Sequence, residues 1–265
     1  MPFPDSPRVI YTNNPLEQVI CQLRFPPILR IDTDLPASYQ DAIRQEYPLF
    51  EEKQEGKPDI IPQQLMGQLP EDFLRLLNVS DKKVYSFISI DEQWIVSLTR
   101  DFIALTANNY TRWEEFKEHF KVPFETLLNE YTPALFSRVG LRYQNVIRRS
   151  ALGLNNIPWS RLIQPYIAGP LAAPDFDNDS VVNTTQLVEI LLRNDYGKVK
   201  IRHGFAVDNS TQEICYVIDS DFSAEKIKES KDALDRLERF NRRAGRLFRW
   251  CIKPQLHEAM GPQNI

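Results

Sequence analysis

The sequence predicts an α+β fold made of two antiparallel β-meanders, each followed by a packed helix. Three short runs rich in β-branched and aromatic residues lie between residues 83 and 107, with only tight-turn spacing between them. A similar set lies between residues 186 and 222. The segment after each set repeats apolar residues at spacings of three and four, as an amphipathic helix does. Because this order occurs twice, the sequence also raises the hypothesis of an internal repeat.

The first predicted element is a strand within residues 18–31. Apolar and polar residues alternate from Gln18 onward, as they do in a half-buried strand. Pro26 and Pro27 cannot donate ladder hydrogen bonds, so the strand must end there, bulge there or lie at an edge. A helix is predicted from Pro36 to about Tyr47, because proline is tolerated in a first helical turn.

The first meander contains the runs KVYSFISI, QWIVSLTR and DFIALTA. Thr111 then opens a helix with Glu114 three residues later, which predicts a capping box. The apolar stripe of this helix consists of Trp113, Phe116, Phe120, Phe124 and Leu127. Pro123 is expected to kink or split the helix. A further strand is predicted from Phe136 to Ile147.

Residues 151–182 predict a proline-rich connector between two parts of the chain. An N-terminal α+β domain would cover residues 1–150, and a C-terminal meander with a long helix would cover residues 183–265. One short helix is expected around Ser160 to Tyr166, and residues 168–182 should be the most protease-sensitive internal segment. Pattern alone leaves open whether the two meanders form separate domains or one sheet, because strand pairing is not encoded locally.

The second meander contains QLVEILL, KVKIRHGFAV and EICYVIDSDF, and a long helix follows it. Ser223 is predicted to cap this helix, which should end near Trp250. Its apolar face should pack on the sheet formed by residues 186–222.

Composition narrows the classes of function. The net charge of −4 gives no general attraction to nucleic acid or anionic membranes. With only 9 glycines, the chain has no phosphate-binding glycine loop and no nucleophile elbow, so we expect no cofactor and do not favour an enzyme. The first residues do not resemble a signal peptide and no 18 apolar residues run together, so we expect a cytoplasmic protein.

Residues that could bind a metal are dispersed. The three cysteines, Cys21, Cys215 and Cys251, lie in apolar runs and are expected to be buried. His119, His203 and His257 show no metal-ligand spacing. The acidic run from Asp175 to Asp179 resembles a calcium loop but lacks the glycine and the closing glutamate of that motif. The sequence therefore predicts no metal site.

The last predicted helix separates apolar residues from arginines around its axis. On a wheel of about 100° per residue, one arc is led by Leu234, Leu237, Phe240 and Phe248. The opposite arc carries six arginines, namely Arg236, Arg239, Arg242, Arg243, Arg246 and Arg249. So dense a cationic face repels itself unless carboxylates or phosphates lie opposite. These six arginines are the candidate partner-binding residues.

Two interpretations of the arginine face remain open. In the first interpretation, acidic residues of this chain neutralise the arginine face, among them Glu225, Glu229, Asp232, Asp235 and Glu238. In the second interpretation, an acidic partner binds to the arginine face. A second basic set, namely Arg138, Arg142, Arg148 and Arg149, extends the patch if it faces the helix. Because no aromatic residues are interleaved on the arginine face, a protein partner is favoured over single-stranded nucleic acid.

Several segments resemble the signature segments of a sporadically distributed family of prokaryotic proteins without an assigned activity. These are NPLEQVICQLRFPP, WIVSLTRDFIALTANNYTRWEEF and RVGLRYQNVI, and the resemblance extends to the tail FRWCIKPQLHEAMGP. It implies no catalytic or binding residues. A patchy distribution is typical of accessory genes in mobile toxin–antitoxin or antiviral-defence systems. The resemblance therefore implies an interaction protein that acts on a partner encoded nearby.

The sequence as a whole favours a non-enzymatic accessory protein that binds an acidic protein partner through its arginines. One alternative is a nucleic-acid-associated accessory protein, in which the same arginines contact phosphates. Another is a small-ligand or hydrolase site that is assembled only in three dimensions. A pocket with convergent polar groups would support this last alternative.

Overall fold

The computed structural model describes residues 2–54, 83–174, 180–193 and 197–264. Within these residues, nine strands form one antiparallel sheet. The chain combines this sheet with helices, which confirms the α+β class. The order across the sheet is β3 (Leu49–Gln54), β4 (Lys83–Ile88), β5 (Trp94–Thr99), β6 (Phe102–Ala107), β2 (Leu16–Arg24), β7 (Phe136–Ile147), β10 (Ile214–Ile227), β9 (Lys198–Val207) and β8 (Thr185–Leu191).

The two parts of the chain share this sheet, which answers the question that the sequence left open. β2 pairs with β7 along most of its length, so that Cys21 lies opposite Leu141 and Leu23 opposite Val139. β7 pairs on its other side with β10. Strands from residues 1–150 and strands from residues 183–265 are therefore neighbours in one continuous sheet. The two predicted parts of the chain do not form separate sheets.

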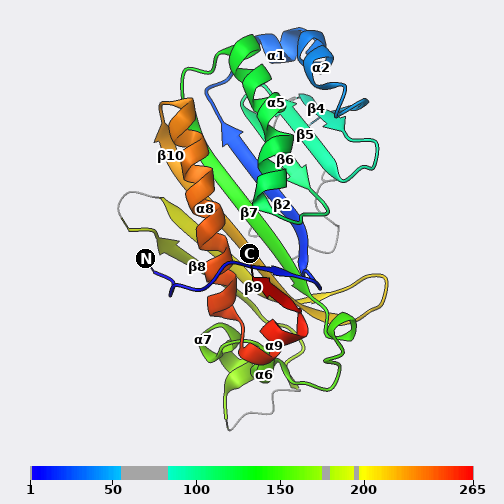
Figure 1. Ribbon diagram of the computed structural model, residues 1–265, viewed down its shortest axis with the longest axis vertical. Helices are drawn as coiled ribbons and strands as arrows, with labels where there is room; N and C mark the ends of the chain where they lie inside the picture. Colours follow the sequence, from blue (N-terminus) through cyan, green and yellow to red (C-terminus); the bar gives the residue numbers. More distant parts are fainter. Residues whose placement is uncertain (1, 55–82, 175–179, 194–196, 265) are drawn as a thin grey trace.

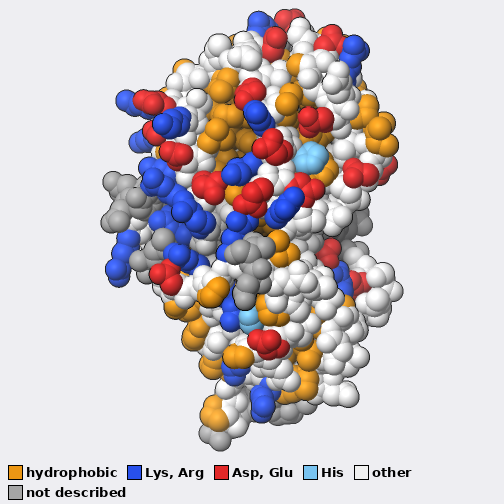
Figure 2. Space-filling model, in the orientation of Figure 1, with side chains coloured by type: hydrophobic (Ala, Val, Ile, Leu, Met, Phe, Trp, Pro, Cys, Tyr) orange, Lys and Arg blue, Asp and Glu red, His pale blue; other side chains and the backbone are white. Residues whose placement is uncertain are grey.

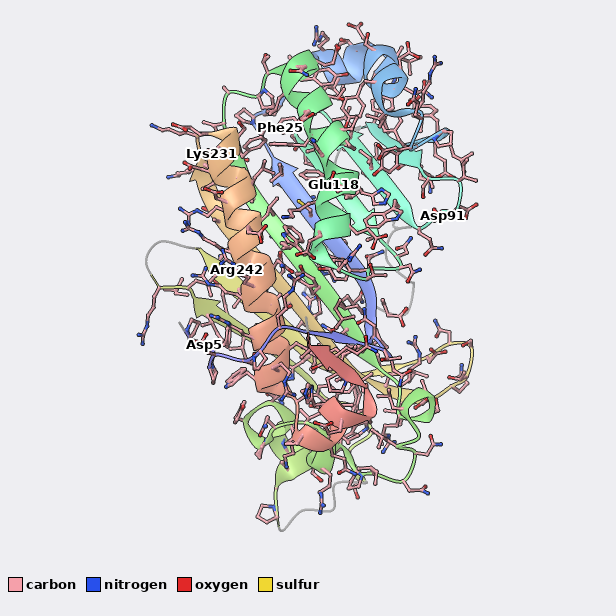
Figure 3. The ribbon with its side chains drawn as sticks, viewed as in Figure 1. Asp5, Phe25, Asp91, Glu118, Lys231 and Arg242 are labelled. Carbon is pink, nitrogen blue, oxygen red and sulfur yellow. The ribbon has the colours of Figure 1, made fainter. Side chains whose placement is uncertain are left out.

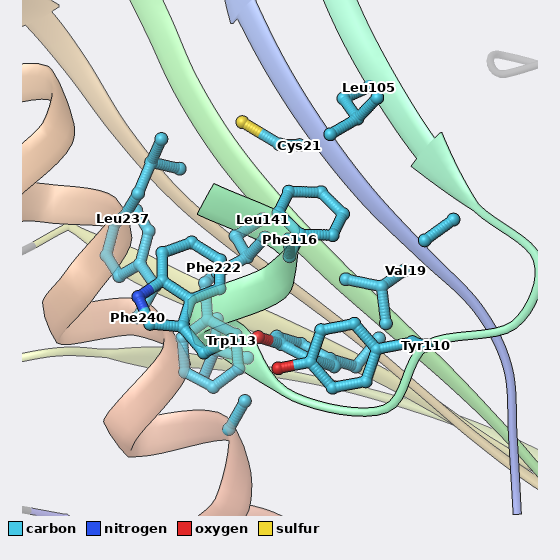
Figure 4. Close-up of a cluster of buried hydrophobic side chains, with 14 of the residues drawn as sticks. Val19, Cys21, Leu105, Tyr110, Trp113, Phe116, Leu141, Phe222, Leu237 and Phe240 are labelled. Carbon is cyan, nitrogen blue, oxygen red and sulfur yellow. The ribbon is translucent and has the colours of Figure 1, made fainter. Parts of the chain in front are cut away.

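Two long helices, α5 (Trp113–Tyr131) and α8 (Ser230–Cys251), cover the same face of the sheet (Figure 1). Side chains alternate across a strand, and the fully buried Val19, Cys21 and Leu23 of β2 face these helices. Figure 4 shows Phe222 of β10 beside Leu237 and Phe240 of α8, next to the aromatic residues that begin α5. The core thus lies between the sheet and the two helices. α8 packs on β10 of the second meander, as expected, and also on β7, which lies outside the predicted residues 186–222.

Shorter elements complete the architecture. They are α1 (Arg30–Thr33), α2 (Ala37–Ile43), α6 (Trp159–Leu162), α7 (Pro165–Ala168), α9 (Pro254–Ala259) and the 3-10 turns η1 (Ser150–Leu152) and η2 (Gly169–Ala172). A separate two-stranded ribbon pairs β1 (Val9–Tyr11) with β11 (Pro262–Asn264), and we call it the terminal ribbon. In Figure 1 the N-terminal segment crosses in front of α8 to reach this ribbon.

Up to residue 172 the predicted connector is packed structure, and it contains two short helices, α6 and α7, where one was expected around Ser160 to Tyr166. Leu162, Ile163 and Ala168 are fully buried, and Leu171 is nearly so. The prolines of this stretch stand at the starts of α6, α7 and η2, where a missing N–H is tolerated, and they therefore begin helical turns instead of marking a loop. The acidic run from residue 175 to residue 179 lies outside the described residues, as does part of the predicted protease-sensitive segment.

Both predicted helix caps are wrong. Arg112, not Thr111, is the N-cap of α5, and Glu114 binds Arg8 instead of closing a capping box. Ser223 lies inside β10, which continues to Ile227 because it keeps pairing with β7 as far as Phe136. α8 begins only at Ser230.

Pro123 does not split α5, and the reason lies in a residue far away in sequence. A proline inside a helix leaves the carbonyl four residues earlier without its N–H donor. That carbonyl belongs to His119, and the hydroxyl of Tyr47 donates a hydrogen bond to it at 2.8 Å. A second buried hydroxyl, from Tyr39, donates to the Pro123 carbonyl at 3.0 Å. Helix α5 therefore runs unbroken from Trp113 to Tyr131.

Two leucines of α8 provide a matched test of its packing. Leu237 is 2 % exposed, whereas Leu234, assigned by sequence to the same apolar arc, is 44 % exposed. Leu237→Ala should lower the free energy of unfolding by about 2–5 kcal/mol, because it leaves a cavity against β7 and β10. Leu234→Ala should change it by only about 0.5 kcal/mol. Urea unfolding of both variants tests this, and equal losses would contradict the packing described for α8.

His203 of β9 makes stability depend on pH. Its side chain is 2 % exposed, its Nδ1 lies 3.0 Å from the Tyr216 hydroxyl, and burial lowers its pKa to about 4. The unfolded chain, with an ordinary pKa of about 6.5, takes up this proton first as the pH falls. The neutral imidazole therefore stabilises the fold fully above pH ~6.5. As the pH falls from that value to pH ~4, up to about 3 kcal/mol of the free energy of unfolding is lost.

The comparison of wild type with His203→Gln isolates this titration from that of the carboxylates. In urea unfolding at several pH values, the stability difference between the two proteins should shrink as the pH falls from 7 to 4.5. A difference that stays constant over this range would show that His203 is not held neutral by burial.

Candidate functional site

The six arginines of α8 do not form one exposed face. Arg242 is exposed, four others are partly buried, and Arg243 is only 6 % exposed. On the helical wheel Arg243 lies about 20° from Arg236 and borders the apolar arc at Leu247, which explains its burial. Arg242, Arg246 and Arg249 lie towards the opposite border of the arginine arc. The arginine arc is therefore divided between two sides of the helix.

Arg242, Arg246 and Arg249 line a cavity of about 370 Å³. Its walls come from three segments that are distant in sequence: residues 6–11 of the N-terminal segment, residues 110–113 at the start of α5, and residues 241–249 of α8. Tyr143 and Asn145 of β7 also line it. Figure 3 shows Arg242 on α8, above the place where the N-terminal segment that carries Asp5 crosses the helix.

The charged groups lining this cavity are all of one sign. Five arginines contribute to its lining, namely Arg8, Arg112, Arg242, Arg246 and Arg249, and no acidic residue or lysine of the described residues does. Figure 2 shows Lys and Arg side chains gathered beside the middle of α8. A hollow lined by cations concentrates anions, because low-dielectric walls focus the field.

Two of the five guanidiniums form ion pairs just outside the cavity. Arg8 donates to both carboxylate oxygens of Glu114 at 2.8 and 2.7 Å, and this contact lowers the pKa of Glu114 to about 2. Arg246 lies 2.7 Å from the exposed carboxylate of Asp5. Arg112, Arg242 and Arg249 form no ion pair within the part of the chain that the structure describes. The cavity therefore keeps a positive excess.

The inner wall of the cavity is polar but uncharged. The Tyr143 hydroxyl donates to Asn241 Oδ1 at 2.9 Å, and Tyr110 makes a longer contact of 3.5 Å with the same oxygen. Burial raises the pKa of both phenols, so both remain protonated donors. Asn145 donates from Nδ2 to the Ile218 carbonyl at 3.2 Å.

The terminal ribbon positions the N-terminal wall of the cavity. Beyond β1, the Thr12 and Asn13 amides donate to the carbonyls of Gly261 and Met260 at 3.0 and 2.9 Å. The Tyr11 hydroxyl lies 2.9 Å from His257 Nδ1, and burial raises the pKa of Tyr11 to about 12 although Arg249 opposes the shift. The site thus requires residues from both ends of the described chain.

The second basic set does not extend the arginine patch. Arg138 and Arg142 alternate with the buried Val139 and Leu141 of β7, so they lie on the face of the sheet that α5 and α8 do not cover. They bind carboxylates there, Arg138 to Asp221 at 2.7 Å and Arg142 to Asp219 at 2.7 Å. The remaining two are also engaged: Arg148 pairs with Asp208 at 2.7 Å, and Arg149 lies over the Trp159 ring at 4.7 Å.

Other candidate chemistry is not brought together. All three cysteines are buried, as expected. The histidines lie apart and serve packing or hydrogen bonding; His119 stacks on Trp94 with 3.8 Å between ring centroids. No group of three or more His, Cys, Asp or Glu within the described ranges could hold a metal ion. Nor is any helix there long and apolar enough to cross a membrane.

Sequence reasoning missed half of this cavity. It found the α8 arginines from their periodicity, but Arg8, Arg112 and the polar floor come from elements that only the fold brings together. One signal was present: Asn241 lies within the apolar arc of α8, between Phe248 and Leu234, and Gly245 lies at the edge of that arc. A polar amide within an apolar arc needs hydrogen-bond partners, which indicates a polar place on the buried face of the helix.

Comparison with known proteins returns no match to any protein-family model, curated protein or solved structure. What the site does must therefore be argued from its own geometry.

Neighbouring arginines of α8 test how the arginine arc is divided. Arg243→Gln should lower the free energy of unfolding by about 1–3 kcal/mol, because it truncates a buried, packed side chain. Arg242→Gln should change it by about 0.5 kcal/mol at most, because that side chain is exposed. Thermal or urea unfolding distinguishes the two, and the assignment of Arg243 to the core fails if both variants are as stable as the wild type.

Proposed function

We propose that the protein is a non-enzymatic binding protein that recognises an acidic segment of a protein partner through the arginine-lined cavity. The observation that carries this proposal is that five arginines and, among the described residues, no acidic residue line the cavity. Arginine suits this role because its planar fork binds carboxylates in bidentate geometry. Arg242 and Arg112, which are exposed and form no described ion pair, are the residues that a partner meets first.

A compact acidic group fits this surface better than a nucleic-acid backbone does. A phosphate backbone needs an extended row of cations. Here acidic side chains surround the cavity, including Asp5, Glu114 and Glu238, and Figure 2 shows further carboxylates gathered above the basic cluster. A long polyanion would meet these carboxylates, whereas one or two acidic side chains would not. The arginines on the other face of the sheet are already paired with Asp219 and Asp221.

The cellular setting follows from the resemblance noted in the sequence. A sporadically distributed prokaryotic family supports a cytoplasmic accessory role beside a partner encoded nearby, in a mobile toxin–antitoxin or antiviral-defence system. An internal repeat belongs to the same proposal. It is supported by the order of the described elements, in which three meandering strands (β4 to β6, or β8 to β10) precede a long helix (α5 or α8) in each half.

Titration with a diglutamate peptide, a short and otherwise neutral peptide that carries two adjacent glutamates, tests the proposed recognition directly. Fluorescence anisotropy at low salt should detect binding to the wild type, and Arg112→Gln/Arg242→Gln should weaken it at least tenfold, equivalent to about 1.4 kcal/mol. Arg161→Gln, which removes one exposed arginine of α6 outside the cavity, is the control and should bind like the wild type. Proteins that co-purify with the wild type but not with the double variant would then identify the partner.

Two outcomes would overturn the proposal. Equal binding by the double variant and the control would show that the cavity arginines are not the recognition element. Tight binding of a single-stranded oligonucleotide, falling log-linearly with salt and lost in the double variant, would favour the nucleic-acid alternative.

A further inference from the structure

We propose that the cavity is a nucleotide site, which binds a phosphate at its arginines and the base against its inner wall. The inference rests on the proposed function only in using the same guanidiniums as anion-binding groups. It goes beyond that function because the inner wall of the cavity has chemistry that a carboxylate does not use.

The cavity is graded from a charged mouth to a neutral interior. Arg112 and Arg242 are exposed, whereas Tyr143 and Asn145 are each 5 % exposed and Trp113 is 3 % exposed. A ligand that fills the cavity must therefore be anionic at one end and uncharged at the other. A nucleotide has this distribution, because its phosphate is charged and its base is neutral.

The interior offers a hydrogen-bond donor and an acceptor that the fold leaves unused. Asn241 accepts hydrogen bonds at Oδ1, but its Nδ2 makes none within the described residues. Asn145 donates from Nδ2, but its Oδ1 accepts none there. Tyr143, which donates to Asn241, keeps acceptor capacity on its hydroxyl oxygen. A carboxylate only accepts hydrogen bonds, whereas the edge of a base both donates and accepts.

Aromatic walls and volume agree with a planar ring. Trp113 and Phe248 contribute aromatic, apolar surface to the lining, against which the uncharged part of a ligand can pack. Trp113 is held in place by the hydrogen bond from its Nε1 to Glu238 at 2.7 Å and by stacking on Phe116. The volume of about 370 Å³ lies in the range of small-ligand pockets.

Isothermal titration calorimetry of the full chain tests the inference with defined probes. The four ribonucleoside monophosphates are compared with their nucleosides, with ribose 5-phosphate and with inorganic phosphate. At least one nucleotide should bind ten or more times tighter than both its nucleoside and ribose 5-phosphate. That result would require contacts to the phosphate and to the base together.

Two variants separate the two ends of the site. Arg242→Gln should weaken nucleotide binding about tenfold and leave the preference for one base unchanged. Asn241→Asp keeps the size of the side chain and the acceptor for Tyr143 but removes the amide donor. It should bring the affinity ratio between the nucleotide and ribose 5-phosphate close to one. Arg161→Gln again serves as the control, and circular dichroism checks that each variant is folded.

Equal binding of nucleotides, ribose 5-phosphate and inorganic phosphate would overturn the inference, because the base would then contribute nothing. Absence of nucleotide binding would overturn it as well. In either case, the proposed function stands if the diglutamate peptide still binds in an Arg112- and Arg242-dependent way. The proposed function and the nucleotide inference are both contradicted only if neither the peptide nor any nucleotide binds.

Discussion

The pairing of β2 with β7 is the interaction on which the rest of the structure depends. It converts two groups of strands into one nine-stranded sheet and places their long helices on the same face. Because α5 and α8 then lie side by side, Trp113 of one reaches Glu238 of the other. The candidate site follows from the same pairing: β7 supplies Tyr143 and Asn145 between the two helices, where neither helix fills the space completely.

Charge is distributed differently on the two faces of this sheet. On the face without long helices, cations and anions alternate on adjacent strands, and Arg138 and Arg142 are bound to aspartates of β10. On the helix side, the arginines of α8 meet the N-terminal segment instead of a facing strand. Among the arginines that line the cavity, Arg246 pairs with Asp5 and Arg8 with Glu114. Cations still outnumber anions around the cavity, which supports the proposal that its ligand is a small, local anion.

Local patterns predicted the elements well and their ends poorly. The bounds of β7 and β9 were readable because alternation and β-branched residues are local properties. Ser223 was misread as a cap because β10 continues along its neighbour, which no local pattern reveals. Arg243 was placed on the surface because a wheel gives angles but does not show how wide the buried arc is. Likewise, Arg8 and Tyr110 have no sequence signal that joins them to α8, since only the terminal ribbon and the sheet bring them together.

The hydrogen bond from Tyr47 to the His119 carbonyl has an evolutionary consequence. Proline at position 123 is tolerated only while a donor reaches that carbonyl, and the donor comes from a distant part of the chain. Selection therefore acts on positions 47 and 123 together. In homologous chains, Pro123 and the tyrosine at position 47 should covary, so that a chain that has replaced the proline is free to lose the hydroxyl. This pair would mark common ancestry even where the surrounding surface has diverged.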